Sequence, residues 1–400
     1  MHVRRSVLTI ALLLAVASSG RAAAPPLSLR LAEALAVPGY SASASGAVVV
    51  DLTTGATVFA RNPDLPLEPA SNEKLAVTFA ALHELGVTYR FRTEVFGRGR
   101  QEGSTWQGDI VLKGFGDPTL TSLQIGRLAT QIARLGIKRV TGRVLGDESW
   151  FDTKRTGPGW KASFFLKECP PLSALVVDRA SYDGHVALQP ALAAAAQLRK
   201  LLRAHGVSTG PVGLGRAPAG ALALAQVDSG TLPEVLQEMN RASDNFTAEL
   251  LTKELGAEVG DGGTTAAGVA IVRKELATSG IPLAGVRIVD GSGLSLADRL
   301  TARAVSALLV TAWNDSELRQ TVWSSLAVAG VNGTLENRMQ RRPARASVHA
   351  KTGTTDEASA LSGYAHGRYA FALLENGDPV AIGPAHKAED QFATVLASAG

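Results

Sequence analysis

The sequence predicts an α+β protein with an antiparallel sheet flanked by helices and a second, strand-rich domain inserted into it. Apolar, β-branched runs near both ends of the chain predict strands, and segments of helical periodicity lie between them. A stretch in the first half is instead rich in Gly, Pro and short Val/Leu segments. We therefore assign residues 25–92 and 225–400 to one domain and residues 93–224 to an insert.

Residues 1–24 have the pattern of a signal peptide. Arg4 and Arg5 precede a short apolar run, and Ala22–Ala24 offers a small-residue cleavage site. Cleavage would also remove Arg21 and lower the formal net charge from +4 to +1, so the basic pI is no evidence for a nucleic-acid partner. We expect an exported protein, in the periplasm or at the extracellular or cell-wall face. Membrane association and the export route stay open.

The first elements of the mature chain are predicted from short-range patterns. Residues 46–50 are apolar and β-branched, residues 53–55 form a turn, and residues 57–59 return as a second strand. A helix is predicted over residues 71–85, where Gly86 ends it.

Later elements are predicted from the helical spacing of apolar residues and from apolar, β-branched runs. In the insert, residues 109–113 and 143–145 are predicted strands and the Ala-rich residues 191–204 a helix. Beyond it, helices are predicted at 232–255, 302–310, 316–323 and 387–399, and strands at 347–351 and 369–374.

The first chemical signature is the S-x-x-K box Ser71-Asn72-Glu73-Lys74. At this spacing Ser71 and Lys74 share one helix face. A serine needs a base to become a nucleophile, and a buried lysine can supply a neutral amine. We expect Glu73 to point away from Ser71. Alone, the box is weak evidence, because a capping serine with a solvated lysine gives the same pattern.

The second signature is Ser243-Asp244-Asn245. The serine hydroxyl can relay a proton to a leaving amine, and the asparagine amide can hold the substrate backbone and the lysine. We expect Asp244 to be structural. A polar helix cap is the alternative interpretation of the triplet.

The third signature is Lys351-Thr352-Gly353-Thr354 on an apolar strand. Such a strand can pair with an extended peptide, while Gly353 leaves room for the peptide backbone. Lys351 and a hydroxyl of Thr352 or Thr354 can bind a terminal carboxylate. The N–H groups of Ser71 and Thr354 can form an oxyanion hole.

The ordered set S-x-x-K, S-D-N, K-T-G is the signature of penicillin-recognising serine enzymes. The chain resembles the D-alanyl-D-alanine carboxypeptidase/endopeptidase family, the class C low-molecular-weight penicillin-binding proteins. The 172 positions from Ser71 to Ser243 leave room for an insert of the kind this family carries. Class A β-lactamases lack it, and their E-x-x-L-N string is absent between Ser243 and Lys351. Further segments carry the resemblance: Leu112-Lys-Gly-Phe-Gly-Asp-Pro-Thr119, Gly142-Arg-Val-Leu-Gly-Asp147, Trp150-Phe-Asp152, Met239-Asn-Arg-Ala-Ser-Asp-Asn245, Asp290-Gly-Ser-Gly-Leu-Ser295 and Val331-Asn-Gly-Thr-Leu335.

The resemblance implies a serine β-lactamase/DD-peptidase-like fold and a D-Ala-D-Ala carboxypeptidase that forms an acyl-enzyme on Ser71. Peptidoglycan stem peptides would be its substrates and β-lactams its inhibitors. The implied catalytic residues are Ser71, Lys74, Ser243, Asn245 and Lys351. The implied substrate-binding residues are Thr352, Gly353, Thr354, Trp150 and Asp152. The last two would contact the third residue of the stem peptide, whereas packing for Trp150 and a turn for Asp152 are the alternatives.

Acyl transfer needs no cofactor, and the scattered histidines with a single cysteine, Cys169, predict no metal site. Nothing in the sequence indicates an obligate protein partner. A β-lactamase or esterase of the same fold and a non-catalytic wall-binding protein remain as alternatives. The balance of carboxypeptidase and endopeptidase action, and the oligomeric state, stay open.

Overall fold

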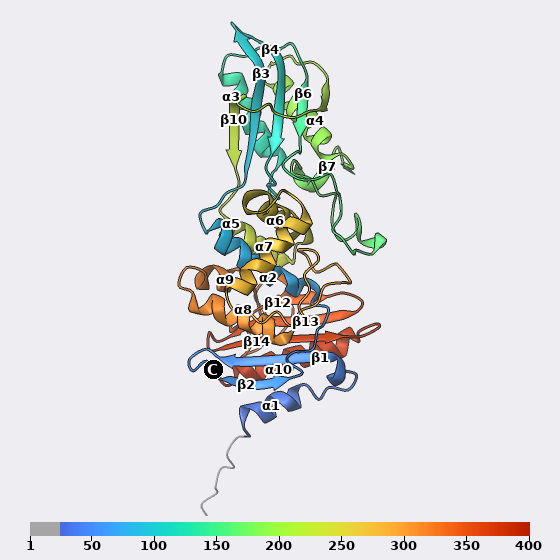
Figure 1. Cartoon of the computed structure of the whole chain (residues 1–400), viewed down its shortest axis with the longest axis vertical. Coiled ribbons are helices and arrows are strands. Elements are labelled where there is room, and N and C mark those ends of the chain that lie inside the picture. The colour runs from blue at the N-terminus through green and yellow to red at the C-terminus, as the bar shows by residue number, and fades with distance from the viewer. Residues whose placement is uncertain (1–24) are drawn as a thin grey trace, which may run out of the picture.

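The computed structural model describes residues 25–400, and the predicted signal peptide lies outside the described residues. Within this part of the chain, none of the helices combines the length and the apolarity needed to cross a bilayer. The molecule is elongated, with one sheet at each end and a cluster of helices between them (Figure 1).

Strands from both ends of the chain form one of the two sheets, as predicted. It has six strands in the order β11-β12-β13-β14-β1-β2, all paired antiparallel. Near the middle of the sheet, β1 lies beside β14, with Val49 opposite Phe371. The strands are β1 (Ser45–Asp51), β2 (Thr57–Arg61), β11 (Ala327–Val328), β12 (Val348–Thr354), β13 (Ala358–Ala365) and β14 (Tyr369–Asn376).

Helices cover both faces of this sheet, which explains why β1 is an unbroken apolar run instead of an alternating one. Val48 and Val50 face the helix cluster, whereas Ala47 and Val49 face the two terminal helices, α1 and α10. The terminal helices are α1 (Leu27–Ala34) and α10 (Ile382–Ala397). The cluster contains α2 (Glu73–Leu85), α5 (Leu232–Ala242), α6 (Asn245–Val259), α7 (Thr265–Thr278), α8 (Ala302–Asn314) and α9 (Arg319–Ser325).

The second sheet is built by the stretch between α2 and α5. Its strand order is β10-β3-β4-β6-β9, with β5 beside β4. β3 and β10 pair antiparallel, whereas β4, β6 and β9 pair in parallel. Helices α3 (Ser122–Arg134) and α4 (Pro190–Ala204) pack on it and form a separate core. The strands are β3 (Arg92–Glu102), β4 (Thr105–Gly114), β5 (Arg139–Val140), β6 (Val144–Asp147), β9 (Val212–Leu214) and β10 (Leu222–Asp228), and a small hairpin adds β7 (Ser181–Tyr182) and β8 (His185–Val186).

Two elements differ from the sequence-based expectation in ways that matter for the site. The helix predicted over residues 71–85 begins with a 3-10 turn, η2 (Ala70–Asn72), before α2. The helical stretch predicted over residues 232–255 is two helices, because Ser243 adopts a left-handed conformation with φ 58° and ends α5. Both breaks fall inside the chemical signatures.

Candidate active site

Neighbouring loops pack tightly against the turn that carries Ser71. Ala70, directly before the serine, has φ 45°, a conformation that non-glycine residues adopt rarely. The loop around Gly293 packs against this turn so closely that a Cβ at Gly293 would come within 1.9 Å of the Ala70 carbonyl oxygen. Ser71 stays partly exposed, whereas α2 behind it is buried through most of its length.

Lys74 lies one turn further along and is completely buried. Its Nζ is 2.8 Å from Ser71 Oγ, 2.8 Å from Asn245 Oδ1 and 2.6 Å from the Ser292 carbonyl oxygen. Burial lowers the pKa of the Lys74 amine to about 8, and the nearby charges of Asp290 and Asp244 oppose that shift. A substantial neutral fraction near neutral pH allows this amine to accept a proton from Ser71.

The second signature spans the break between α5 and α6. Asp244 caps α6 by accepting the N–H groups of Phe246 and Thr247, which confirms the structural role expected for it. Asn245 begins α6 and turns Oδ1 towards Lys74, while its Nδ2 donates to the Glu168 carbonyl oxygen at 3.1 Å. The two hydrogen bonds fix the orientation of the amide.

The third signature lies on β12. Lys351 is fully buried, and its Nζ donates to Ser243 Oγ and to the Thr352 carbonyl oxygen, both at 2.8 Å. Burial, reinforced by the charge of Lys74, holds the pKa of Lys351 well below its usual value. Thr352 Oγ1 is 2.8 Å from Thr334 Oγ1, and Thr354 is exposed at the end of the strand.

Gly353 is required by the packing of the protein itself. A Cβ at this position would come within 2.8 Å of the Pro69 carbonyl oxygen and 3.1 Å of Asn72 Nδ2. Asn72 in turn donates to the Lys351 carbonyl oxygen at 3.3 Å. The strand therefore presses directly on the turn that carries Ser71, and a side chain would push the two signatures apart.

The structure thus brings the three signatures into one cluster of side chains: Ser71, Lys74, Ser243, Asn245 and Lys351. Trp150 and Asp152 lie elsewhere. Trp150 Nε1 donates to Glu254 at 3.0 Å, and Asp152 accepts from Lys253 at 2.5 Å. Both partners are on α6, at least eight residues beyond Asn245, which is about 12 Å along the helix axis.

The Ser292 carbonyl oxygen belongs to a loop, residues 290–295, whose contact with Lys74 no sequence pattern predicts. Glu249 Oε1 accepts the N–H groups of Gly291 and Ser292 at 3.0 and 2.8 Å. Asp290 accepts from Gly293 and Ser295 and from Trp160 Nε1 of the insert. The Asp-Gly-Ser-Gly string signals a tight loop with free backbone donors. No sequence signal distinguishes Glu249 from an ordinary helical glutamate.

Buried acids surround this loop. Glu73 is completely buried, and neither of its carboxylate oxygens has a hydrogen-bond partner among the described residues. Burial and the charge of Asp290 raise the pKa of Glu73 well above its usual value. The same two effects raise the pKa of Glu249 to about 8. Both carboxyl groups are therefore harder to ionise than an exposed glutamate.

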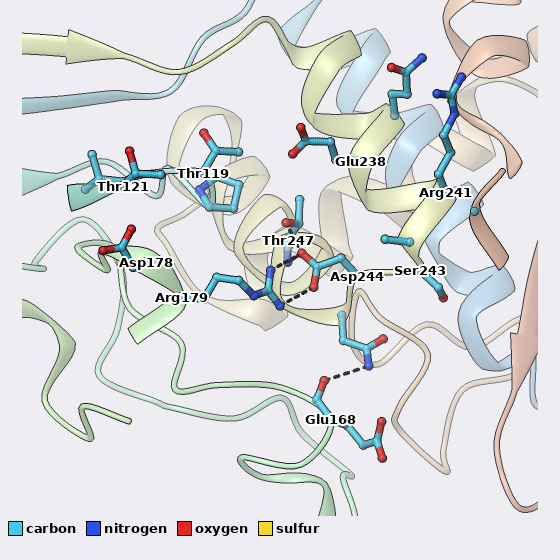
Figure 2. A pocket seen from close by; sticks show the side chains of 16 residues that line it. Thr119, Thr121, Glu168, Asp178, Arg179, Glu238, Arg241, Ser243, Asp244 and Thr247 are labelled. Atoms are coloured by element: carbon cyan, nitrogen blue, oxygen red, sulfur yellow. Dashed lines mark hydrogen bonds and ion pairs between the residues drawn. The ribbon is translucent and has the colours of Figure 1, made fainter. Parts of the chain in front are cut away.

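A groove of about 1110 Å³ runs along the second signature (Figure 2). The insert lines one side with Thr119, Glu168 and Arg179, and α5 lines the other with Glu238 and Arg241.

Across residues 25–400, no three or more His, Cys, Asp or Glu side chains are grouped as metal ligands. Cys169 is a buried free thiol.

The fold and the serine–lysine pair define a serine acyl-transfer enzyme. The model of the D-Ala-D-Ala carboxypeptidase 3 (S13) family matches residues 27–189 and 184–399, and the chain belongs to that family. This confirms the resemblance inferred from the three signatures.

Individual relatives and solved structures support the same family assignment. The chain is 31% identical to a D-alanyl-D-alanine carboxypeptidase of Actinomadura sp. (strain R39) over 446 residues, covering 90% of this chain and 82% of the relative. The crystal structure of penicillin binding protein 4 (dacB) from Haemophilus influenzae superposes with a TM-score of 0.80 at 21% identity, covering 91% of this chain and 97% of that one. A structure of the same protein in complex with a β-lactam has a TM-score of 0.72 at 19% identity and covers 90% and 98% of the two chains. The predicted fold class is therefore confirmed.

Proposed function

We propose that the chain is a D-Ala-D-Ala carboxypeptidase that cleaves peptidoglycan stem peptides through an acyl-enzyme on Ser71. The contact between Ser71 Oγ and the buried Lys74 Nζ carries the proposal. Lys74 takes the proton from Ser71, whose oxygen bonds to the carbonyl carbon between the two D-alanines. The N–H groups of Ser71 and Thr354 hold the resulting oxyanion.

Breakdown of this intermediate releases the terminal D-alanine. The Ser243 hydroxyl passes its proton to the departing amine as the C–N bond breaks and receives in exchange the proton that Lys74 took from Ser71, which leaves Lys74 neutral again. Lys351 beside Ser243 binds the terminal carboxylate together with Thr352 or Thr354. Asn245 aligns the substrate amide. Water then attacks the ester carbonyl carbon, the neutral Lys74 amine takes a proton from the water, and that proton returns to Ser71 Oγ as the ester C–O bond breaks.

A β-lactam presents a reactive amide and a carboxylate at the same relative positions, so it should acylate Ser71 and stall there. The family and the signal-peptide pattern of residues 1–24 support a location in the periplasm or at the extracellular face of the cell wall. Endopeptidase action would use the same catalytic residues and differ only in the size of the leaving group.

Mass spectrometry of the intact protein after brief exposure to benzylpenicillin tests this function. We expect one adduct per chain and, separately, D-alanine release from uncrosslinked stem peptides. Consumption of penicillin without an adduct would instead indicate a β-lactamase. No adduct, no penicillin loss and no D-alanine release would indicate a non-catalytic wall-binding protein.

The acylation rate is expected to rise with pH through about 8, the pKa of the buried Lys74 amine. The neutral amine accepts the Ser71 proton, and a lowered pKa means that this form becomes dominant above pH 8 and is lost below it. The second-order rate constant for benzylpenicillin, measured from about pH 6 to 10, checks this. A profile that rises only near pH 10, the range of a solvated lysine, would contradict it.

Asp152→Asn is expected to lower the free energy of unfolding by about 2–3 kcal/mol, because it leaves the buried Lys253 ammonium without its carboxylate. Denaturant unfolding measures this, with Asp183→Asn as a control on an exposed pair. D-alanine release from stem peptides that differ in the third residue then tests substrate contact. A changed preference among them would support a binding role for Asp152, and an unchanged one would limit it to holding the insert on α6.

A further inference from the structure

A strained turn of the insert reaches the second signature. Asp178, Arg179 and Ala180 are three successive non-glycine residues with left-handed backbones, at φ 46°, 55° and 63°. L-residues avoid this region because Cβ crowds the following carbonyl, and a run of three is rare. Such strain persists only where the surroundings impose it, and it concentrates at functional sites.

Hydrogen bonds hold both ends of this turn, and at its far end the Ala180 carbonyl oxygen accepts the Ala187 N–H at 2.7 Å. Asp178 accepts the Ser122 N–H at 3.0 Å, and its own N–H donates to the Leu120 carbonyl oxygen at 2.9 Å. Between these anchors and the β7–β8 hairpin, the turn projects Arg179 out of the insert and across the groove towards α6 (Figure 2).

The guanidinium of Arg179 meets Asp244 in a bidentate pair. Nη1 and Nη2 each donate to a different carboxylate oxygen at 2.7 Å. The guanidinium carbon also lies 5.0 Å from the centre of the Phe246 ring. Burial would raise the pKa of Asp244, but the hydrogen bond and charge of Arg179 outweigh it, and the net pKa is lowered. Asp244 is therefore ionised and its position is fixed from the insert side.

Asp244 sits between two residues of the reacting cluster. The residue before it, Ser243, contacts Lys351, and the residue after it, Asn245, contacts Lys74. The N–H groups of Ser243 and Asp244 both donate to the Met239 carbonyl oxygen, so backbone bonds hold this turn to the end of α5. The Arg179 pair holds the same turn from the insert side. A displacement of about 1 Å at a reacting group can cost about 100-fold in rate.

We propose that Arg179 is a positioning residue of the acyl-transfer site, through which the insert fixes the Ser243–Asn245 turn against Lys74 and Lys351. The proposal rests on the proposed function and extends it, since it makes the insert a working part of catalysis. The Glu168 carbonyl oxygen, which accepts from Asn245, is a second contact of the insert to the same turn.

The test compares full-length variants in benzylpenicillin acylation and in D-alanine release. Arg179→Ala is expected to slow acylation by roughly 10- to 100-fold. Arg303→Ala is the matched control, because Arg303 makes a bidentate pair with Asp64 and is similarly exposed but lies outside the site. We expect the control to stay within about twofold of the native rate. Thermal unfolding of both variants separates a rate effect from loss of fold.

The pH profile adds a readout that a purely structural role would not move. Without Arg179, the Asp244 carboxylate is uncompensated and should raise the pKa of Lys74, which moves the acid limb of kcat/KM to higher pH. Asp244→Asn should move the limb to lower pH. The groups that face Lys74 are Glu73 on α2, Glu249 on α6, Asp244, Asp290 in its loop, Cys169 in the insert and Lys351 on β12.

The outcomes are separable. If the native protein forms no adduct and releases no D-alanine, the proposed function fails. If it does both, and Arg179→Ala matches Arg303→Ala, the inference about Arg179 alone is overturned. Should the alanine variant not fold, Arg179→Lys replaces it, because lysine keeps the charge but lacks the two-pronged geometry. A native rate in that variant would equally overturn the inference.

Discussion

Ser71→Ala is expected to abolish the benzylpenicillin adduct and to lower D-alanine release by at least about 10⁴-fold. The reason is that Ser71 Oγ is the atom that bonds to the substrate carbonyl, so no acyl-enzyme can form without it. Only binding and oxyanion stabilisation would remain. Intact-mass measurement and a D-alanine assay on the same preparation check the two halves of the prediction.

Ser104→Ala is a suitable control, because Ser104 is an exposed serine in the β3–β4 hairpin, far from the cluster. It should keep the adduct and the native turnover. An adduct of unchanged stoichiometry in Ser71→Ala would show that another residue is the nucleophile.

Lys74→Ala is expected to reduce acylation by about 10³-fold, the size of a typical general-base contribution. The substitution removes the amine that receives the Ser71 proton and leaves Asn245 Oδ1 and the Ser292 carbonyl oxygen without their donor. The residual rate should also lose the dependence on a group with a pKa of about 8. Stopped-time mass spectrometry over a range of pH measures both effects.

Lys200→Ala, at an exposed lysine on α4, controls for loss of a positive charge. It should acylate at the native rate with an unchanged pH profile. Preserved turnover in Lys74→Ala would exclude Lys74 as the base and leave the buried amine with a purely structural role.

The sequence predicts those strands and helices that the local pattern of apolar residues is enough to specify. β1 and β14 are apolar runs, and the three signatures could be ordered without knowing how they meet. The strand β13 was missed, because Ala358–Ala365 consists mostly of small residues and is buried on both faces, so it carries neither alternation nor a β-branched signature. The break at Ser243 was missed as well, since helical periodicity continues on both sides of it.

Only those site residues that belong to a sequence motif could be predicted. Ser71, Lys74, Ser243, Asn245 and Lys351 were named from spacing and order, and the structure brings them within hydrogen-bonding distance. Glu249 and Arg179 were not identified, because their importance depends on which backbone or side chain they meet across the fold. Arg179 lies 65 positions before its partner Asp244, and no local pattern links the two.

The pairing of β1 with β14 affects the order in which the chain can fold. Ser45 and Glu375 are neighbours in the sheet although 330 positions separate them, so closing that contact carries a large loop entropy. The second sheet is assembled from residues 92–228 alone and can form earlier, through shorter loops. Nearly the entire polypeptide must therefore be synthesised before the sheet that contains β1 is complete. β14, which pairs with β1, is the last strand of this sheet in the sequence. Until β14 has been made, the edge of β1 that pairs with it is exposed and open to aggregation.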